Sequence, residues 1–196
     1  KQLDKIADHH QGVALQVEGY IYANLQDVIQ RAQERDEPLF VLLLDLIQDP
    51  QNFGTLLRTA EAVGVHGVVM PRRRSASITP AVVNASSGAS EHLLVVQANL
   101  SQTLPVILKA GVWIIGLEGS SDAQLLEKMD LSGPLGVVVG SEGEGMRKLV
   151  RRSCDVLVRL PMRGKIESLN AAVAGSIVLY SAYLSRCQSA KKMGYL

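Results

Sequence analysis

Short, uninterrupted apolar runs alternate with helical patterns along most of the chain, and this alternation constrains the fold more than any other feature. Residues 40–44 and 135–140 contain only apolar residues and glycine, which suits strands buried on both faces of a parallel sheet. Further strands are predicted at residues 67–70, 93–96, 112–117 and 156–160. Helices are predicted at residues 50–63, 80–85, 104–110, 146–152 and 169–187. Strands that alternate with helices indicate an α/β fold, in which helices cover both faces of the sheet.

Three polar clusters stand at the ends of these apolar runs, where strands would pass into loops or helices. They are DPQNFGTLLR at residues 49–58, GSEGEG at residues 140–145, and LPM with SLN at residues 160–162 and 168–170. In an open α/β sheet, the loops at the carboxyl ends of the strands form the ligand crevice. Three such loops in one small domain predict a single composite site.

Composition narrows the class of protein. The 196 residues are enough for one domain with a substantial core, and 47% hydrophobic with 20% charged residues is typical of a globular chain. Cys154 and Cys187 cannot build a disulfide framework, and neither a CxxC pair nor histidine spacing indicates a metal site. The apolar stretches are too short to span a bilayer and no signal peptide is visible, so a cytoplasmic location is expected.

The net charge of +1 hides two local basic clusters: Arg72–Arg74, and the group of Arg147, Lys148, Arg151 and Arg152. A polyanionic partner is therefore possible, although the overall balance does not require one. We expect Arg72–Arg74 to lie on a flexible loop and to contact phosphates rather than bases. The alternative is a solvated loop without a partner.

The second polar cluster follows a strand and precedes a helix, as a dinucleotide-binding turn does. However, its spacing is GxxGxG rather than GxGxxG, and Glu142 and Glu144 would repel a pyrophosphate at the helix N-terminus. A P-loop is absent as well, because no Gly-Lys-Ser/Thr follows. The loop therefore suits a ligand with an uncharged or cationic centre. A plain glycine turn with acidic helix-capping residues is the alternative.

Taken alone, the other two clusters have ordinary structural explanations. Pro161 ends a strand and frees backbone groups for a ligand, while Ser168 stands where the N-cap of the last helix would be. Asn52 and Arg58 are six residues apart, so one helix would not place them on the same face. By itself, Arg58 is therefore best interpreted as a solvated helix arginine.

Together, the three clusters resemble the signature motifs of the SpoU (TrmH) RNA 2′-O-ribose methyltransferases of the SPOUT superfamily. The matching patterns are DPxNxGxxxR at residues 49–58, GxEGxG at residues 140–145 and LPM-x5-SLN at residues 160–170. The resemblance extends over about residues 38–186. With HQGV at residues 10–13, it is greatest to the 23S rRNA guanosine methyltransferases of that family.

This resemblance implies a mostly parallel sheet flanked by helices, with a deep C-terminal trefoil knot in which the second and third motifs meet. It also implies S-adenosylmethionine as the cofactor, held in a bent pose mainly by backbone groups, and no metal. By motif position, the residues that bind the cofactor are Gly116, Leu117, Gly140, Leu160, Met162 and Leu169.

For catalysis, the resemblance implies roles for Arg58, Asn52, Glu142, Ser168 and Asn170 in methyl transfer to a ribose 2′-hydroxyl. A guanidinium is an awkward base, because its pKa lies above about 12. We therefore expect Arg58 to clamp the adjacent phosphate and polarise the hydroxyl. Asn52 and Asn170 are expected to orient the loops and Arg58, and Ser168 to hold the loop or the substrate. Glu142 is expected to fix the knot or to pair with a cation.

The resemblance also implies a homodimer, in which the last helix supplies much of the interface and the RNA site lies across both subunits. The expected substrate is a guanosine of 23S rRNA, and tRNA is the alternative. Two other classes stay open. One is an RNA-binding module without catalysis, and the other is a nicotinamide oxidoreductase, which the glycine spacing disfavours.

The polar start of the chain predicts a domain boundary. Residues 1–19 are interpreted as a linker from an N-terminal RNA-binding domain that is missing from this chain, and residues 20–196 as the catalytic domain. A trimmed tag or a disordered arm is the alternative for the first segment.

Overall fold

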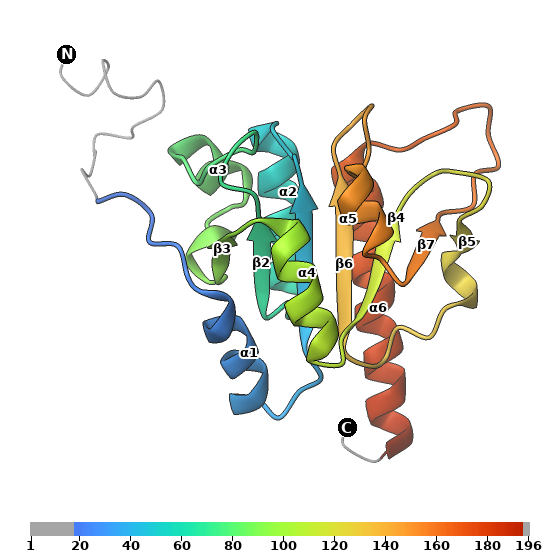
Figure 1. Cartoon of the computed structure of the whole chain (residues 1–196), viewed down its shortest axis with the longest axis horizontal. Coiled ribbons are helices and arrows are strands. Elements are labelled where there is room, and N and C mark those ends of the chain that lie inside the picture. The colour runs from blue at the N-terminus through green and yellow to red at the C-terminus, as the bar shows by residue number, and fades with distance from the viewer. Residues whose placement is uncertain (1–17, 194–196) are drawn as a thin grey trace.

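A single parallel sheet organises the chain, whose computed structural model describes residues 18–193 (Figure 1). The strand order is β3-β2-β1-β6-β4-β7-β5, and every pairing is parallel. The strands are β1 (Phe40–Asp45), β2 (Gly67–Met70), β3 (Val95–Gln97), β4 (Trp113–Leu117), β5 (Gln124–Leu125), β6 (Leu135–Gly140) and β7 (Val156–Arg159). The predicted α/β class is confirmed.

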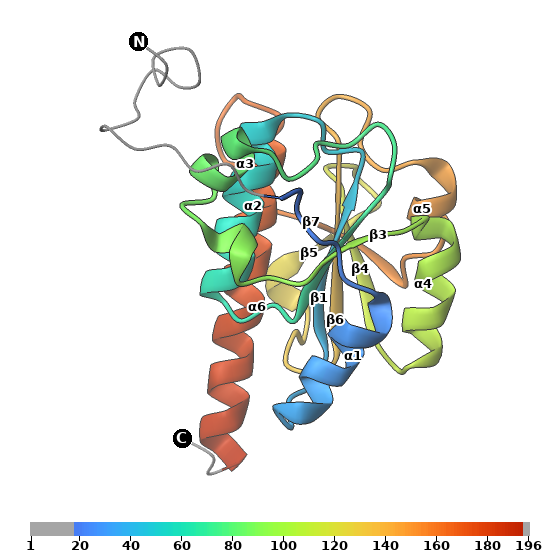
Figure 2. The same cartoon turned by 90° about the vertical axis from the view of Figure 1, so that its left-hand side faces the viewer.

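Helices cover both faces of the sheet and make a three-layer structure (Figure 2). One face carries α2 (Pro50–Ala62), α3 (Pro80–Ala85) and α6 (Ala171–Met193), and the other carries α1 (Leu25–Glu34), α4 (Leu100–Lys109) and α5 (Lys148–Arg152). Successive residues of β1 pack alternately into these two cores, with Leu42 on the α2 side and Leu43 on the α4 side. Both sets are buried, which explains the continuous apolar run.

The position of α2 follows from signals in the sequence. The Asp49 carboxylate accepts a hydrogen bond from the backbone N–H of Asn52 (2.7 Å), and Pro50 occupies the first turn. Gly64, with φ of +74°, follows the end of the helix. The predicted cap is confirmed, and it places Asn52 at the carboxyl edge of the sheet.

Several predicted boundaries are wrong, and local hydrogen bonds explain two of them. α4 begins at Leu100 rather than residue 104 because the Asn99 side chain accepts from the N–H of Ser101 (3.1 Å). α5 begins at Lys148 rather than residue 146, because the backbone N–H of Arg147 is held by Asp45. α6 runs from Ala171 to Met193 rather than over residues 169–187, and β3 begins two residues later than predicted.

Two tyrosines attach the first described residues to the domain. The Tyr20 hydroxyl lies 3.1 Å from the carbonyl oxygens of Ser90 and Leu93, and the Tyr22 hydroxyl accepts from the N–H of Ile78. Residues 1–17 of the predicted linker lie outside the described residues. The knotted chain path stays a prediction. Within residues 18–193, no helix is both long and apolar enough to cross a membrane.

A buried histidine lies immediately before β2. His66 is inaccessible to solvent, its Nδ1 accepts from the N–H of Phe40 (3.0 Å), and its Nε2 lies 3.0 Å from Glu37 Oε2. Nε2 therefore carries the proton, and the ring is neutral. Burial lowers the pKa of His66 below its ordinary value of 6.5.

This geometry predicts that acid weakens the fold. As the pH falls through the unfolded pKa of 6.5, the unfolded chain binds a proton that the folded chain excludes, so the free energy of unfolding falls. Urea unfolding at about pH 7.5 and about pH 5.5 measures the loss. In His66→Gln, which removes the titrating ring, the difference between the two pH values should shrink. An equal loss in both proteins would contradict the assignment to His66.

Candidate active site

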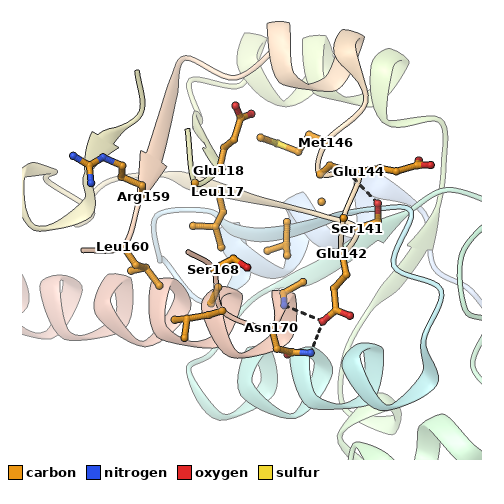
Figure 3. Close-up of a pocket in the computed structure, with 18 of the residues that line it drawn as sticks. Leu117, Glu118, Ser141, Glu142, Glu144, Met146, Arg159, Leu160, Ser168 and Asn170 are labelled. Atoms are coloured by element: carbon orange, nitrogen blue, oxygen red, sulfur yellow. Dashed lines mark hydrogen bonds between the residues drawn. The ribbon is translucent and has the colours of Figure 1, made fainter. Parts of the chain in front are cut away.

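A large cavity of the described chain opens at the carboxyl ends of β4, β6 and β7 (Figure 3). Its volume is about 810 Å³. Four segments and the Arg151 side chain of α5 supply its walls. The segments lie within residues 117–119 at the end of β4, residues 139–146 around the end of β6, residues 159–162 at the end of β7, and residues 167–174 at the start of α6. The second and third motifs thus meet in one site, as the sequence predicted.

The glycine loop between β6 and α5 is a closed turn. Ser141 and Gly145 exchange backbone hydrogen bonds of 3.1 and 3.0 Å. Gly143 and Gly145 have φ of +82° and +68°, which only glycine adopts readily. A Cβ added to Gly140 would lie 2.3 Å from the Gly145 carbonyl carbon, so no side chain fits there. The spacing of the motif is therefore a requirement of this turn.

A polar network joins the three motifs. Asn170 Nδ2 donates to Glu142 Oε1 and, at 2.9 Å, to Asn52 Oδ1. Its Oδ1 accepts from the N–H groups of Ala172 (3.0 Å) and Val173 (3.1 Å). Asn170 thus caps α6 while it connects the first motif to the second. Ser168, the predicted cap, does not cap the helix, which begins at Ala171; Ser168 lines the cavity instead.

Most of the predicted cofactor residues line the cavity: Leu117, Gly140, Leu160, Met162 and Leu169. Gly116 does not. A Cβ there would approach Cys154 Sγ and Met146 Cε to 2.8 Å, so this glycine permits close packing behind the wall. Burial raises the pKa of Cys154 to about 12, so its thiol stays protonated and does not serve as a nucleophile.

Arg58 is separate from the network. Its side chain is exposed on α2 and lines neither this cavity nor the smaller one described below. The Asn52 and Asn170 side chains contact each other, but within residues 18–193 neither makes a hydrogen bond to Arg58. The expected orientation of Arg58 by these asparagines is therefore not seen within one subunit.

Sequence reasoning missed an ion pair that holds the glycine loop. Asp45, fully buried at the end of β1, accepts from the backbone N–H and the Nε of Arg147, both at 2.7 Å, and its Oδ1 lies 2.7 Å from a terminal guanidinium nitrogen of Arg147. The sequence did carry one signal of this ion pair, namely the carboxylate of Asp45 at the end of an apolar strand. The residues lie 102 positions apart, so nothing in the sequence indicated the partner.

The two predicted basic clusters differ in the structure. Arg147 pairs with Asp45, and the Arg151 guanidinium lies 2.8 Å from Glu118, whose hydrogen bond raises the pKa of Arg151. Arg147 and Arg151 therefore hold the site and are not free for a polyanion, whereas Lys148 and Arg152 of the same cluster are exposed. Arg72–Arg74 are exposed.

The loop that carries Arg72–Arg74 is held at three points, although a flexible loop was expected. Arg72 Nε donates to Gln97 O (3.3 Å). The N–H of Ala76 donates to Ile47 O (2.8 Å), and the N–H of Ile78 donates to the Tyr22 hydroxyl (3.1 Å). The three arginines therefore stand on a hydrogen-bonded loop beside the connection between β1 and α2. Arg72, Arg73 and Arg74 are called the arginine ridge below.

A smaller cavity of about 300 Å³ adjoins the first. Residues 46–49 and Asn52 line it, and Ser141, Glu142 and Glu144 line both cavities. The glycine loop is thus a common wall. In the part of the chain that the structure describes, no group of three or more His, Cys, Asp or Glu side chains could hold a metal ion.

Comparison with known proteins agrees with the motif assignment. The profile of the SpoU rRNA Methylase family matches residues 39–180. The Bacillus subtilis protein YacO, assigned to the TrmH family of tRNA/rRNA methyltransferases, is 45% identical over 188 residues, which are 95% of this chain and 75% of YacO.

Solved structures share the fold. The SpoU methyltransferase AviRb from Streptomyces viridochromogenes, in complex with the cofactor AdoMet, matches with a TM-score of 0.73 and 26% identity over 86% of this chain and 66% of AviRb. An RNA 2′-O ribose methyltransferase matches with a TM-score of 0.67 and 25% identity over 88% of this chain and 61% of that protein. The family profile covers most of the sheet, and YacO is similar along nearly the whole chain. The chain therefore belongs to the SpoU (TrmH) family of RNA methyltransferases.

Proposed function

We propose that the protein transfers a methyl group from S-adenosylmethionine to the ribose 2′-hydroxyl of an RNA guanosine, in 23S rRNA. The observation that carries the proposal is the larger cavity, which the second and third motifs both line and whose Asn170 is hydrogen-bonded to Asn52 of the first motif. The 2′-O target is supported by the similarity to an RNA 2′-O ribose methyltransferase.

The cavity fits S-adenosylmethionine. Its volume of about 810 Å³ is within the range of about 300–1,000 Å³ typical of small-molecule sites. Leu117, Leu160 and Leu169 offer apolar walls for an adenine ring, and the Glu142 carboxylate can attract a cationic centre. AviRb, which shares the fold, was solved with AdoMet bound. When bound, this cofactor supplies an electrophilic methyl group.

The exposed face of α6 supports a homodimer. Val173, Ile177, Tyr180 and Leu184 recur every three or four residues and are 45%, 41%, 52% and 50% exposed, which makes an apolar stripe without cover within residues 18–193. We propose that a second copy covers this stripe. Sedimentation that shows only monomer at micromolar concentration would contradict the dimer.

Dimerisation would give Arg58 its role. α2 packs against α6, where Thr59 Oγ1 and Ser176 Oγ lie 2.8 Å apart, so a copy docked on α6 would lie close to Arg58. Because Arg58 does not line the cofactor cavity of its own subunit, we propose that it acts at the cavity of the partner. There its guanidinium would clamp an RNA phosphate with two hydrogen bonds and polarise the adjacent 2′-hydroxyl. The hydroxyl proton would pass to that phosphate as the 2′-oxygen bonds to the methyl carbon. The bond from that carbon to the sulfur of the donor would break at the same time and leave S-adenosylhomocysteine.

Ligand binding tests the proposed cofactor. Calorimetry should show that S-adenosylhomocysteine binds and that NADH does not. The glycine turn places two carboxylates where a pyrophosphate would lie, so it should reject a dinucleotide. NADH binding without S-adenosylhomocysteine binding would contradict the proposal and favour an oxidoreductase.

The arginine ridge should bind RNA through phosphates. Replacement of Arg72, Arg73 and Arg74 by alanine should weaken RNA binding and reduce the slope of log affinity against log salt by about 2 to 3, because each phosphate contact contributes about 0.7 to 0.9. Fluorescence anisotropy at several salt concentrations measures both quantities. A charge-matched control replaces the exposed Arg35, Lys109 and Lys128. If the two triple variants behave alike, the ridge makes no specific phosphate contacts.

A further inference from the structure

The smaller cavity has a lining that suits a neutral group rich in hydrogen-bond donors. Its polar side chains are carboxylates, amides and one hydroxyl, from Gln48, Asp49, Asn52, Ser141, Glu142 and Glu144. Among residues 18–193, no lysine, arginine or histidine lines it. A phosphate would therefore be repelled, whereas a nucleobase can offer N–H groups to these acceptors. The volume of about 300 Å³ is sufficient for one base.

One carboxylate of this cavity is available for a ligand. Glu142 accepts from Asn170 and from the N–H of Ala171, and Asp49 accepts from the N–H of Asn52. Within residues 18–193, the Glu144 carboxylate has neither a hydrogen bond nor an ion pair. Figure 3 shows the Glu144 side chain directed away from Leu117 and Leu160, which stand on the far side of the cofactor cavity. Glu144 lines the smaller cavity as well as the cofactor cavity.

Guanine is the base that fits a carboxylate best. Its N1–H and its N2 amino group are adjacent donors, and they match the two oxygens of a carboxylate in a paired geometry. Adenine and cytosine present one amino group beside an acceptor nitrogen, which a carboxylate repels. We propose that the smaller cavity receives the guanine base of an RNA and that Glu144 selects it. This inference rests on the proposed function, since it places the target nucleoside beside the methyl donor.

The arginine ridge supplies the phosphate contacts that the cavity lacks. The loop of Arg72–Arg74 is hydrogen-bonded through the N–H of Ala76 to Ile47 O, and Ile47 lines the cavity. A base in the cavity would therefore leave the flanking phosphates of its strand near the ridge. A free mononucleotide would gain less from these arginines than a short RNA would.

Nucleotide titrations test the selectivity. Labelled protein saturated with S-adenosylhomocysteine is titrated with 5′-GMP, 5′-IMP and 5′-AMP, and amide NMR shifts are followed. GMP should shift residues 46–52 and 141–145 with an affinity at least about tenfold above that of AMP. IMP, which lacks the N2 amino group, should fall between them. Equal affinities for GMP and AMP, or GMP shifts confined to residues 117–119 and 160–162, would overturn the proposal.

A matched pair of variants tests the residue. Glu144→Gln should weaken GMP binding by about 10- to 100-fold, because an amide cannot accept both guanine donors. Its effect on S-adenosylhomocysteine affinity should be much smaller, because Glu144 lines the cofactor cavity but is directed away from Leu117 and Leu160. Glu61→Gln, an exposed control on α2, should change neither. An equal loss of both affinities in Glu144→Gln would assign this carboxylate to the cofactor and overturn the proposal.

A third experiment distinguishes binding of RNA from binding of a free nucleotide. The trinucleotide UpGpU should bind more tightly than GMP and than UpApU, and the triple alanine variant of the ridge should remove its advantage over GMP. Equal binding of GMP and UpGpU would overturn the RNA assignment. Methyl transfer to rRNA is measured on the same protein. If guanine selectivity persists without any methyl transfer, the proposed function fails. Methyl transfer without guanine selectivity refutes only the assignment of the smaller cavity to guanine.

Discussion

Replacement of Arg58 by alanine is expected to reduce methyl transfer by about 10²-fold or more while the fold and cofactor affinity are retained. Arg58 is exposed, and within residues 18–193 its side chain has no hydrogen-bond partner. The substitution should therefore change the free energy of unfolding little. The transition state would lose the group that positions the phosphate and polarises the hydroxyl. Single-turnover rates with saturating S-adenosylmethionine measure the effect. Arg58→Lys should restore little, because a point charge lacks the bidentate fork.

A mixing experiment distinguishes action across subunits from action within one. Gly140→Ala, whose Cβ would collide with the backbone of Gly145, should remove cofactor binding. Co-expression of Arg58→Ala and Gly140→Ala subunits should give activity far above either parent, since one intact cavity then faces one intact Arg58. If the mixture stays as inactive as its parents, Arg58 does not act across the interface. High activity of Arg58→Ala alone would show that Arg58 is a helix-surface residue without a role in catalysis.

Replacement of Arg147 by methionine is expected to lower the free energy of unfolding by about 3 kcal/mol, because it leaves the Asp45 charge buried without its guanidinium. Asp45 is inaccessible to solvent and, within residues 18–193, would keep only the hydrogen bond from the backbone N–H of residue 147. The glycine loop should loosen with it, so S-adenosylhomocysteine affinity should fall as well. Urea unfolding and calorimetry measure the two effects.

Two further variants isolate the buried charge. Asp45→Asn combined with Arg147→Met removes both charges and should be more stable than Arg147→Met alone. Arg152→Met, on the exposed side of α5, should change stability by no more than about 0.5 kcal/mol. If Arg152→Met and Arg147→Met are equally mild, the ion pair does not hold the loop.

Local signals in the sequence predicted most elements of this fold but not their order in the sheet. The Asp49 cap and Gly64 gave the bounds of α2 to within one residue, and continuous apolar runs gave β1 and β6. α1 was missed because, of its ten residues, only Val28 and Ala32 are buried, so its apolar stripe is thin. The insertion of β6 between β1 and β4 depends on long-range pairing, which no local pattern encodes.

The candidate site was predicted to the extent that motif spacing reflects local geometry. Glycines at 140, 143 and 145 are required by the turn itself, so the pattern located the wall of the cavity. The roles of Ser168 and Asn170 were harder to separate, since both are good helix caps. Only the structure shows which of the two side chains accepts hydrogen bonds from the N–H groups of α6. Asp45 and Arg147 pair across 102 positions, and single-sequence patterns carry no such information.

Analysis of methylated nucleosides tests the central claim most directly. The protein is incubated with S-adenosylmethionine carrying a labelled methyl group and with 23S rRNA that was transcribed without modifications, and the RNA is digested and separated by mass spectrometry. The proposed function predicts label in 2′-O-methylguanosine, at one position of the RNA, and none with Arg58→Ala. Label in a base-methylated nucleoside, or no transfer to 23S rRNA or tRNA by a dimer that binds S-adenosylhomocysteine, would contradict it.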